Sequence, residues 1–239
     1  MSVVLYVPNL APSGFNLSPF CYKLEIYLRL AQIPFETREA NMLKAPKRKI
    51  PYVDVEGQLI GDSTLIIQHL QSTTQVDLDA ELSAQQRMQS HLLRRMLEES
   101  TYFSLLYLRW RIEWQHYRPY FLKSLPPMLG GLLVPLIRRS AQKTLHAQGM
   151  GRHTQEEVMS MFNADLACLA QALESQEFAV HSKPSLADAT VYAFLRGFLH
   201  IPWEGPSKQA ALAFPVFESY LQRMDAHLNT LSTSAVATK

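Results

Sequence analysis

Residues 17–36 read LSPFCYKLEIYLRLAQIPFE, a turn followed by an amphipathic pattern and a short apolar end. Ser18 is a residue type that caps helix N-termini, and Pro19 stands at the first helical position, where proline is tolerated. Beyond them, apolar residues recur at spacings of three and four, on one face of a helix: Cys21, Leu24, Leu28 and Ala31. The stretch predicts a helix that begins directly after Ser18.

Strand patterns surround this helix. Residues 3–7 are a β-branched and aromatic run, and residues 33–38 are a second candidate strand. Residues 52–55 and 58–60 are separated by a Glu-Gly pair, which is a hairpin signal, and a capped helix follows from about residue 62 to 70. The order strand, helix, strand, hairpin, helix is that of the thioredoxin fold.

Every strong pattern after a linker at residues 71–79 is helical. One long helix contains residues 88–110 and reaches about residue 117, and further predicted helices cover residues 127–148 (broken by Pro and Gly), 154–174, 185–199 and 215–228. The fold class is therefore an α/β thioredoxin-like N-terminal domain with an all-α C-terminal domain. We expect the first over residues 1–72, the second over 80–228, and a disordered tail at 229–239, which has no apolar period.

Composition and charge exclude several classes of function. The formal net charge of +2 gives no support for a nucleic-acid partner. Two cysteines, Cys21 and Cys168, form no disulfide framework, and no zinc-ligand spacing occurs, so we expect no metal. The start of the chain lacks the pattern of a signal peptide, and the apolar stretch 125–137 is too short and too broken for a transmembrane segment. We expect a cytoplasmic protein with reduced thiols.

The segment Ser18-Pro19-Phe20-Cys21 has the spacing of a redox CxxC motif at a helix start, with serine in place of the first cysteine. No disulfide can form within it, but the position still lies at a helix N-terminus that favours anions. The Ser18 hydroxyl can therefore donate to a thiolate that a ligand brings. Taken alone, Ser18 also fits a plain N-cap, and Cys21 fits the apolar core better than a nucleophile.

Two further short motifs suit a peptide-like ligand. Pro51 follows Lys49-Ile50 directly before a buried strand, a position that often holds a cis peptide bond and exposes the preceding backbone for pairing. Asp62 and Ser63 stand at a helix start, where free N–H groups suit a carboxylate and an acid suits an ammonium group. Each motif alone also fits an ordinary turn or cap.

Together these motifs resemble the glutathione transferase superfamily. A fourth match lies downstream, where residues 185–188 read SLAD before an apolar helix and resemble the N-capping box of the family's helical domain. The resemblance covers residues 1 to about 228. The phrase at 17–36, the short path to KIPYV (49–53) and the run from Glu98 to Trp110 are most similar to the failed-axon-connections and metaxin-like branch.

The resemblance implies roles for the motif residues. Ser18 would hold the glutathione thiolate, the Ile50 backbone before cis Pro51 would pair with the cysteinyl unit, and Lys49 would face the glycine carboxylate. Asp62 and Ser63 would bind the γ-glutamyl end.

The cosubstrate would thus be glutathione, and the partner would be a small apolar electrophile. The resemblance also implies a homodimer. Tyr102, Tyr107 and Trp110 are candidate walls of the electrophile site, and each also fits helix–helix packing.

Two departures leave a second function open. Only residues 39–50 separate the second strand from Pro51, where members of the fold place a helix that contributes to the glutathione site. The Pro/Gly-rich stretch 125–137 is a candidate cover for the cleft and equally a candidate oligomer contact, and the sequence does not distinguish the two. The alternative to an enzyme is a catalytically weak or inactive binding or scaffold protein of metaxin-like type, because fold does not fix function.

Overall fold

A computed structural model describes residues 1–8, 17–125 and 127–236. Four strands form one sheet in the order β2-β1-β3-β4: β1 (Val3–Val7), β2 (Phe35–Glu39), β3 (Tyr52–Val55) and β4 (Gln58–Gly61). β1 pairs parallel with β2 and antiparallel with β3, and β3 and β4 form the predicted hairpin. Glu56 and Gly57 at its turn have positive φ angles of 54° and 91°. This mixed sheet is the expected thioredoxin-like arrangement.

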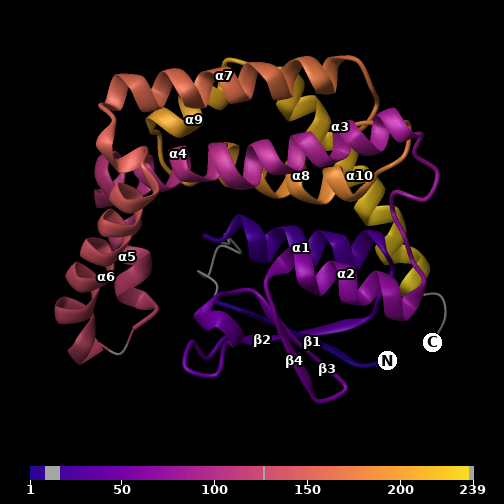
Figure 1. The fold of residues 1–239 in the computed structure, drawn as a ribbon, viewed down its shortest axis with the longest axis horizontal. Helices are drawn as coiled ribbons and strands as arrows, with labels where there is room; N and C mark the ends of the chain where they lie inside the picture. Colours follow the sequence, from indigo (N-terminus) through magenta and orange to yellow (C-terminus); the bar gives the residue numbers. More distant parts are fainter. Residues whose placement is uncertain (9–16, 126, 237–239) are drawn as a thin grey trace.

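Two helices cover the face of the sheet that is turned toward the rest of the molecule (Figure 1). They are α1 (Pro19–Leu30) and α2 (Ser63–Thr74). Helix α2 extends past residue 70, where the pattern predicted its end, and past the predicted limit of the first domain at residue 72. The other face of α1 packs along α8 (Leu186–Leu199), which is buried over almost its whole length.

The path from β2 to the hairpin is short, as predicted. Its regular structure is one 3₁₀ turn, Pro46–Arg48, with no full helix between residues 40 and 51. Gly61 lies against this turn, and a Cβ atom there would come within 2.9 Å of the Pro46 carbonyl oxygen. A side chain at residue 61 would therefore push the turn away from β4.

The long helix predicted to contain residues 88–110 and to reach about residue 117 is divided. It comprises α3 (Ala84–Arg95), α4 (Tyr102–Tyr107) and the two π-helical segments Met96–Thr101 and Leu108–Ile112. The prediction of one helix to about residue 117 is wrong, because the chain breaks at Glu113 before α5 (Trp114–Lys123). The Glu113 carboxylate is 2% exposed and accepts hydrogen bonds from the backbone N–H and the hydroxyl of Ser207, at 2.9 and 2.8 Å. Glu113 thereby fixes the start of α9 (Pro206–Leu212).

Helix α5 and α6 (Pro127–Gln148) form a hairpin that extends away from the other helices, beside the sheet domain (Figure 1). Residues 127–148 were predicted as a broken helical stretch, but they form one helix that contains Pro135. The remaining helices are α7 (Gln155–Glu174) and α10 (Val216–Val236). Helix α10 continues through residues 229–236, which were predicted as disordered, and residues 237–239 lie outside the described part.

One apolar core runs through both parts of the molecule, from the inner face of the sheet through α1 and α8 to α7 and α10. The capping box before α8 is confirmed: the Asp188 carboxylate accepts from the backbone N–H of Ser185 at 2.8 Å. Asp188 is fully buried and also accepts from the Ala179 N–H at 2.8 Å and the Tyr220 hydroxyl at 2.9 Å. Among the described residues, no helix combines the length and apolar character that crossing a bilayer requires.

Candidate functional site

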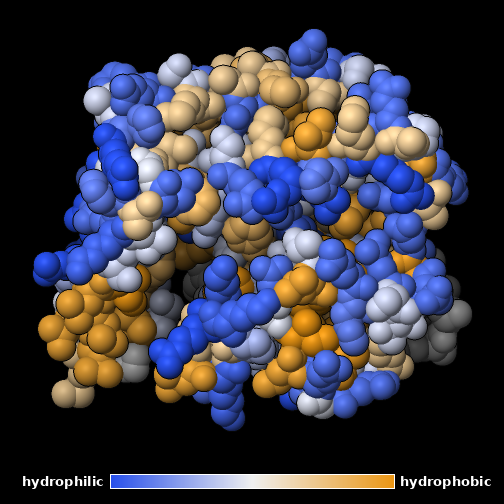
Figure 2. Space-filling model, viewed as in Figure 1, coloured by the Kyte–Doolittle hydropathy of each residue, from blue (hydrophilic) through white to orange (hydrophobic). Residues whose placement is uncertain are grey.

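A cavity of about 1120 Å³ lies where the sheet domain, the helical segments over residues 95–110 and the α5–α6 hairpin meet. It is visible as a dark hollow beside the hairpin (Figure 2). The sheet domain contributes the predicted ligand-binding residues to its wall: Ser18, Lys49, Ile50, Pro51, Asp62 and Ser63. The fold therefore brings together motifs that are up to 45 residues apart in the chain.

Ser18 is the N-cap of α1, in an extended conformation with φ −105° and ψ 109°. Its hydroxyl oxygen accepts a hydrogen bond from the Cys21 backbone N–H at 3.3 Å. A serine hydroxyl is able both to accept and to donate a hydrogen bond. Ser18 thus caps the helix and also places a hydroxyl on the wall of the cavity.

Cys21 lies one turn deeper and is fully buried. Burial raises the pKa of its thiol from 9.0 to about 12, and the neighbouring Ser18 hydroxyl lowers it by a smaller amount. The thiol is thus protonated at neutral pH and closed to solvent. The interpretation of Cys21 as a core residue is confirmed.

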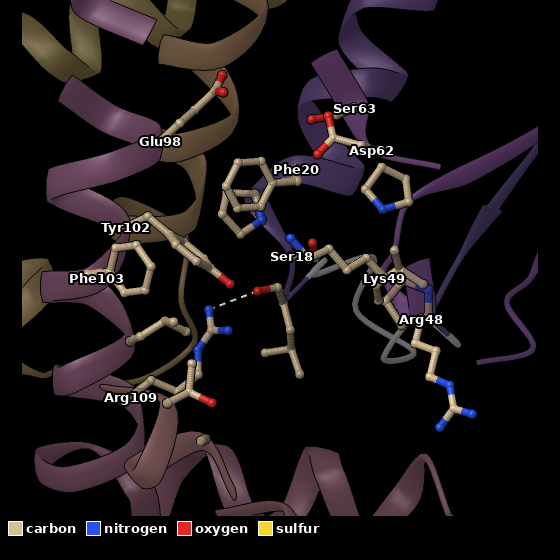
Figure 3. A pocket seen from close by; sticks show the side chains of 18 of the residues that line it. Ser18, Phe20, Arg48, Lys49, Asp62, Ser63, Glu98, Tyr102, Phe103 and Arg109 are labelled. Atoms are coloured by element: carbon tan, nitrogen blue, oxygen red, sulfur yellow. Dashed lines mark hydrogen bonds between the residues drawn. The ribbon is translucent and has the colours of Figure 1, made fainter. Parts of the chain in front are cut away.

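The peptide bond between Ile50 and Pro51 is cis, as the sequence predicted. Pro51 is buried and Ile50 half-buried, whereas Lys49 and Arg48 are exposed at the rim of the cavity. Figure 3 shows the Arg48 side chain pointing away from the centre of the pocket. Lys49, Ile50 and Pro51 thus line the same cavity as Ser18.

Asp62 is the N-cap of α2 and has a positive φ of 83°. Its Oδ1 atom accepts from the backbone N–H groups of Thr64 at 3.0 Å and Leu65 at 3.3 Å. Those N–H groups are therefore already bonded and do not belong to a free anion site. Ser63 is buried beside Asp62 and also lines the cavity.

The opposite wall is aromatic. Tyr102 lines the cavity with its ring edge-to-face against Phe20, at 4.8 Å between ring centroids. Trp110 lines it too and lies 4.7 Å from the ring of Phe121, which comes from the hairpin. The hairpin thus completes the apolar part of the cavity.

Tyr107 does not line the cavity, which corrects the sequence prediction. It is buried in the same apolar cluster as Trp110 but behind the cavity lining, and its hydroxyl donates to the carbonyl oxygen of His153 at 3.3 Å. Five residues along a helix turn a side chain about 140° away from the first, so Tyr102 and Tyr107 face different directions. The alternative interpretation of Tyr107 as helix packing is the correct one.

Two buried charged residues of the wall were missed by sequence reasoning. Glu98 and Arg109 are each 8% exposed, and each lies on one of the two π-helical segments. Such segments are frequent at functional sites, and they change which side chains face inward. A faint signal was present: both charges fall within a stretch that is otherwise largely apolar.

Arg109 reaches toward the segment that carries Ser18 (Figure 3). Its Nη2 atom donates to the backbone carbonyl of Leu17 at 2.8 Å, and its guanidinium lies 4.9 Å from the centre of the Tyr117 ring. The Tyr102 hydroxyl points into the same part of the pocket. Burial raises the pKa of Tyr102 while the charge of Arg109 opposes this, so the hydroxyl remains a proton donor at neutral pH.

Glu98 is held by an ion pair with Lys23 of α1, at 2.6 Å between Nζ and Oε1. The Thr190 hydroxyl donates to the same oxygen at 3.2 Å. Lys23 is fully buried, and burial lowers its pKa against the opposing effect of the Glu98 charge. The pair fixes the helix that begins at Ser18 against the cavity wall.

In residues 1–8, 17–125 and 127–236, no cluster of three or more His, Cys, Asp or Glu side chains is arranged to hold a metal ion. The polar residues that line the cavity instead carry hydroxyl, carboxylate, guanidinium and ammonium groups. They suit an organic ligand with charged ends and a central group near Ser18.

A thioredoxin-like domain joined to a helical domain, with a serine at the start of α1 facing a cavity between them, defines the class of glutathione transferases. A family model described as "Glutathione S-transferase N-terminal domain" matches residues 19–116. The "Isoprene-epoxide--glutathione S-transferase" of Rhodococcus sp. (strain AD45) is 31% identical over 220 residues, covering 87% of this chain and 92% of the relative. The chain belongs to the glutathione S-transferase family.

Other relatives agree with this assignment. "Failed axon connections" of Drosophila melanogaster is 28% identical over 207 residues, and the chain spans about half (49%) of its length. Among solved structures, the β-etherase LigF from Sphingobium sp. strain SYK-6 has a TM-score of 0.64 at 16% identity, with 98% of this chain and 100% of that chain covered. Human glutathione-S-transferase T1-1 has a TM-score of 0.61 at 20% identity, with 98% and 87% covered. These two structures support the fold, and the metaxin-like grouping stays a prediction.

Proposed function

We propose that the protein transfers glutathione to small apolar electrophiles, with Ser18 stabilising the thiolate. The observation that carries this proposal is the position of Ser18, at the N-terminus of α1 and on the wall of a cavity with an aromatic far side. A hydroxyl donor and the positive end of a helix both favour the thiolate over the thiol. A thiolate formed there lies next to any electrophile bound against Tyr102 and Trp110.

Glutathione would be held by the sheet domain. The Ile50 backbone pairs with the cysteinyl unit, and Asp62 attracts the γ-glutamyl ammonium group. Ser63 donates to the γ-glutamyl carboxylate, since the next two backbone N–H groups of α2 are bonded to Asp62. Lys49 faces the glycine carboxylate from the exposed rim, so this end contributes least to binding.

A small epoxide is the electrophile class that the wall and the relative from Rhodococcus support. The thiolate sulfur forms a bond to a ring carbon, and the C–O bond at that carbon breaks with its electrons moving to oxygen. The resulting alkoxide takes a proton from the Tyr102 hydroxyl, which water then restores. Arg109 lies on the same part of the wall and stabilises the negative charge that develops on oxygen.

The test begins with calorimetry of glutathione binding and continues with turnover of an alkyl epoxide and of an aryl halide. Ser18→Ala should leave glutathione affinity nearly unchanged and lower kcat by roughly 10- to 1000-fold, the range for losing a stabilising donor. Ser83→Ala is the matched control, because Ser83 caps α3 through the same type of bond outside the cavity. An unchanged rate in Ser18→Ala would remove Ser18 from the mechanism.

A second candidate function is a non-catalytic binding or scaffold protein. The shortened segment before Pro51 and the engagement of the α2 N-terminus by Asp62 both favour weaker glutathione binding. Absence of binding at millimolar glutathione would support this candidate and refute the enzyme proposal.

A further inference from the structure

The α5–α6 hairpin carries a charge that the rest of the chain does not share. Residues 114–155 contain no Asp or Glu and six basic residues: Arg118, Lys123, Arg138, Arg139, Lys143 and Arg152. The hairpin region therefore carries a charge of +6, whereas the remaining residues, with 17 basic and 21 acidic side chains, carry −4. The overall charge of +2 conceals this asymmetry.

The same hairpin exposes large apolar side chains along α6. Met128, Leu132 and Leu136, spaced four residues apart on one face, are 96%, 67% and 54% exposed, and Leu129 and Ile137 flank them. Figure 2 shows the resulting hydrophobic patch at the lower left, over the free end of the hairpin, with hydrophilic groups bordering it. A contiguous exposed apolar patch of this kind marks an interaction surface.

Three exposed basic residues lie on the two helices of the hairpin that carries this patch. Lys123 ends α5, and Arg139 and Lys143 follow the apolar face along α6, all three of them exposed. Arg138 is turned inward instead, where its Nε donates to the Trp110 carbonyl at 3.0 Å. The hairpin thus combines an apolar end with a cationic border, and it projects from the body where a flat surface can reach it (Figure 1).

We propose that the free end of the α5–α6 hairpin docks on an anionic lipid bilayer. The apolar side chains of α6 enter the interface, and Lys123, Arg139 and Lys143 contact the anionic headgroups. A second copy that pairs hairpin to hairpin is the weaker candidate, because such symmetric pairing brings two basic hairpins together. The docking is peripheral, since no described helix is long and apolar enough to cross the membrane.

Vesicle flotation with the full chain tests the proposal. We expect binding to vesicles of phosphatidylcholine with phosphatidylserine, little binding to phosphatidylcholine alone, and release at high salt. Each basic residue near an anionic surface strengthens binding about fivefold, so Arg139→Glu with Lys143→Glu should weaken it by at least about 30-fold. Lys44→Glu with Lys47→Glu makes the same charge change at exposed lysines outside the hairpin and should have a much smaller effect.

The apolar contribution is tested separately. Leu132→Ser with Leu136→Ser should weaken vesicle binding by about tenfold or more, because the hydrophobic gain of interface insertion is lost. Leu212→Ser on α9 is the control, since Leu212 is 53% exposed, close to the exposure of Leu136. These side chains are exposed in both cases, so the fold is little affected.

Three results would overturn the proposal. The first is no binding to either type of vesicle. The second is binding that both pairs of hairpin substitutions leave unchanged, which would assign the membrane contact to another surface. The third is self-association in solution that Leu132→Ser with Leu136→Ser abolishes, without vesicle binding, which would make a second copy the occupant.

Discussion

The Lys23–Glu98 ion pair joins α1 to the long helix of the cavity wall, with both side chains removed from water. Lys23 is 0% exposed and Glu98 8% exposed, and the two atoms are 2.6 Å apart. Lys23→Met removes the cation and leaves the carboxylate buried, with the Thr190 hydroxyl still donating to it. The perturbation therefore tests whether this pair holds the two parts of the molecule together.

The expected loss follows from the burial. Removing one partner of a buried ion pair costs about 3–5 kcal/mol, because the other charge stays desolvated and unpaired. For a chain of this size each kcal/mol lowers Tm by roughly 2–4 °C, so Tm should fall by roughly 6–20 °C. Replacing both partners, Lys23→Met with Glu98→Met, should recover most of this loss, since an apolar pair carries no desolvation cost.

Urea unfolding followed by circular dichroism measures these differences. Arg95→Met is the control, because Arg95 pairs with Glu99 at 3.0 Å on the same helix but both side chains are more than half exposed. That change should cost no more than about 1 kcal/mol. If Lys23→Met costs as little as Arg95→Met, or if the double replacement is as unstable as the single one, the reasoning from burial is refuted.

Three further changes test other parts of the structure. At pH 8 a thiol reagent should modify the exposed Cys168 rapidly and Cys21 only after denaturation. The pKa of Cys21 is raised to about 12 in the folded protein, so its thiol ionises at lower pH in the unfolded chain. The free energy of unfolding should therefore fall as pH rises from about 9 to 12, and Cys21→Ala should reduce this fall. Asp188→Ala should lower the free energy of unfolding by at least about 2 kcal/mol in urea titration, because it leaves the buried donors of Ser185, Ala179 and Tyr220 unpaired. A loss smaller than that of an exposed cap would contradict the role of Asp188 as their shared acceptor. Arg109→Gln should lower kcat for an epoxide by roughly 100-fold with glutathione affinity unchanged, and Arg109→Lys should restore part of the rate; equal rates in all three proteins would exclude Arg109 from charge stabilisation.

The features that the sequence predicted correctly depend on neighbours in the chain. The start of α1 at Ser18-Pro19, the cis bond before Pro51 and the capping box of Ser185 and Asp188 are each determined within about four residues. The hairpin turn is equally local. Such features are readable because residue type and backbone conformation are directly linked.

The features that it missed depend on distant contacts. Glu98 faces inward because Lys23, 75 residues earlier, is buried opposite it. The helix breaks at Glu113 because that carboxylate accepts from Ser207, 94 residues later. The helical period of 3.6 residues in the sequence contains no information about Lys23 or Ser207 as partners. The π-helical segments also change which residues share a face, so the period no longer predicts which side chains are buried.

The state of the protein's own thiols restricts the chemistry at this cavity. Ser18 occupies the place of the first cysteine of a CxxC motif, and Cys21 is buried with its pKa raised to about 12. Cys168 lies on α7 and is not among the described residues that line the cavity. Because neither cysteine supplies a thiolate there at neutral pH, sulfur chemistry in this cavity needs the thiol of a ligand. A hydroxyl donor at Ser18 would stabilise the thiolate of such a ligand. This arrangement favours attack of that thiolate on an electrophile over disulfide exchange.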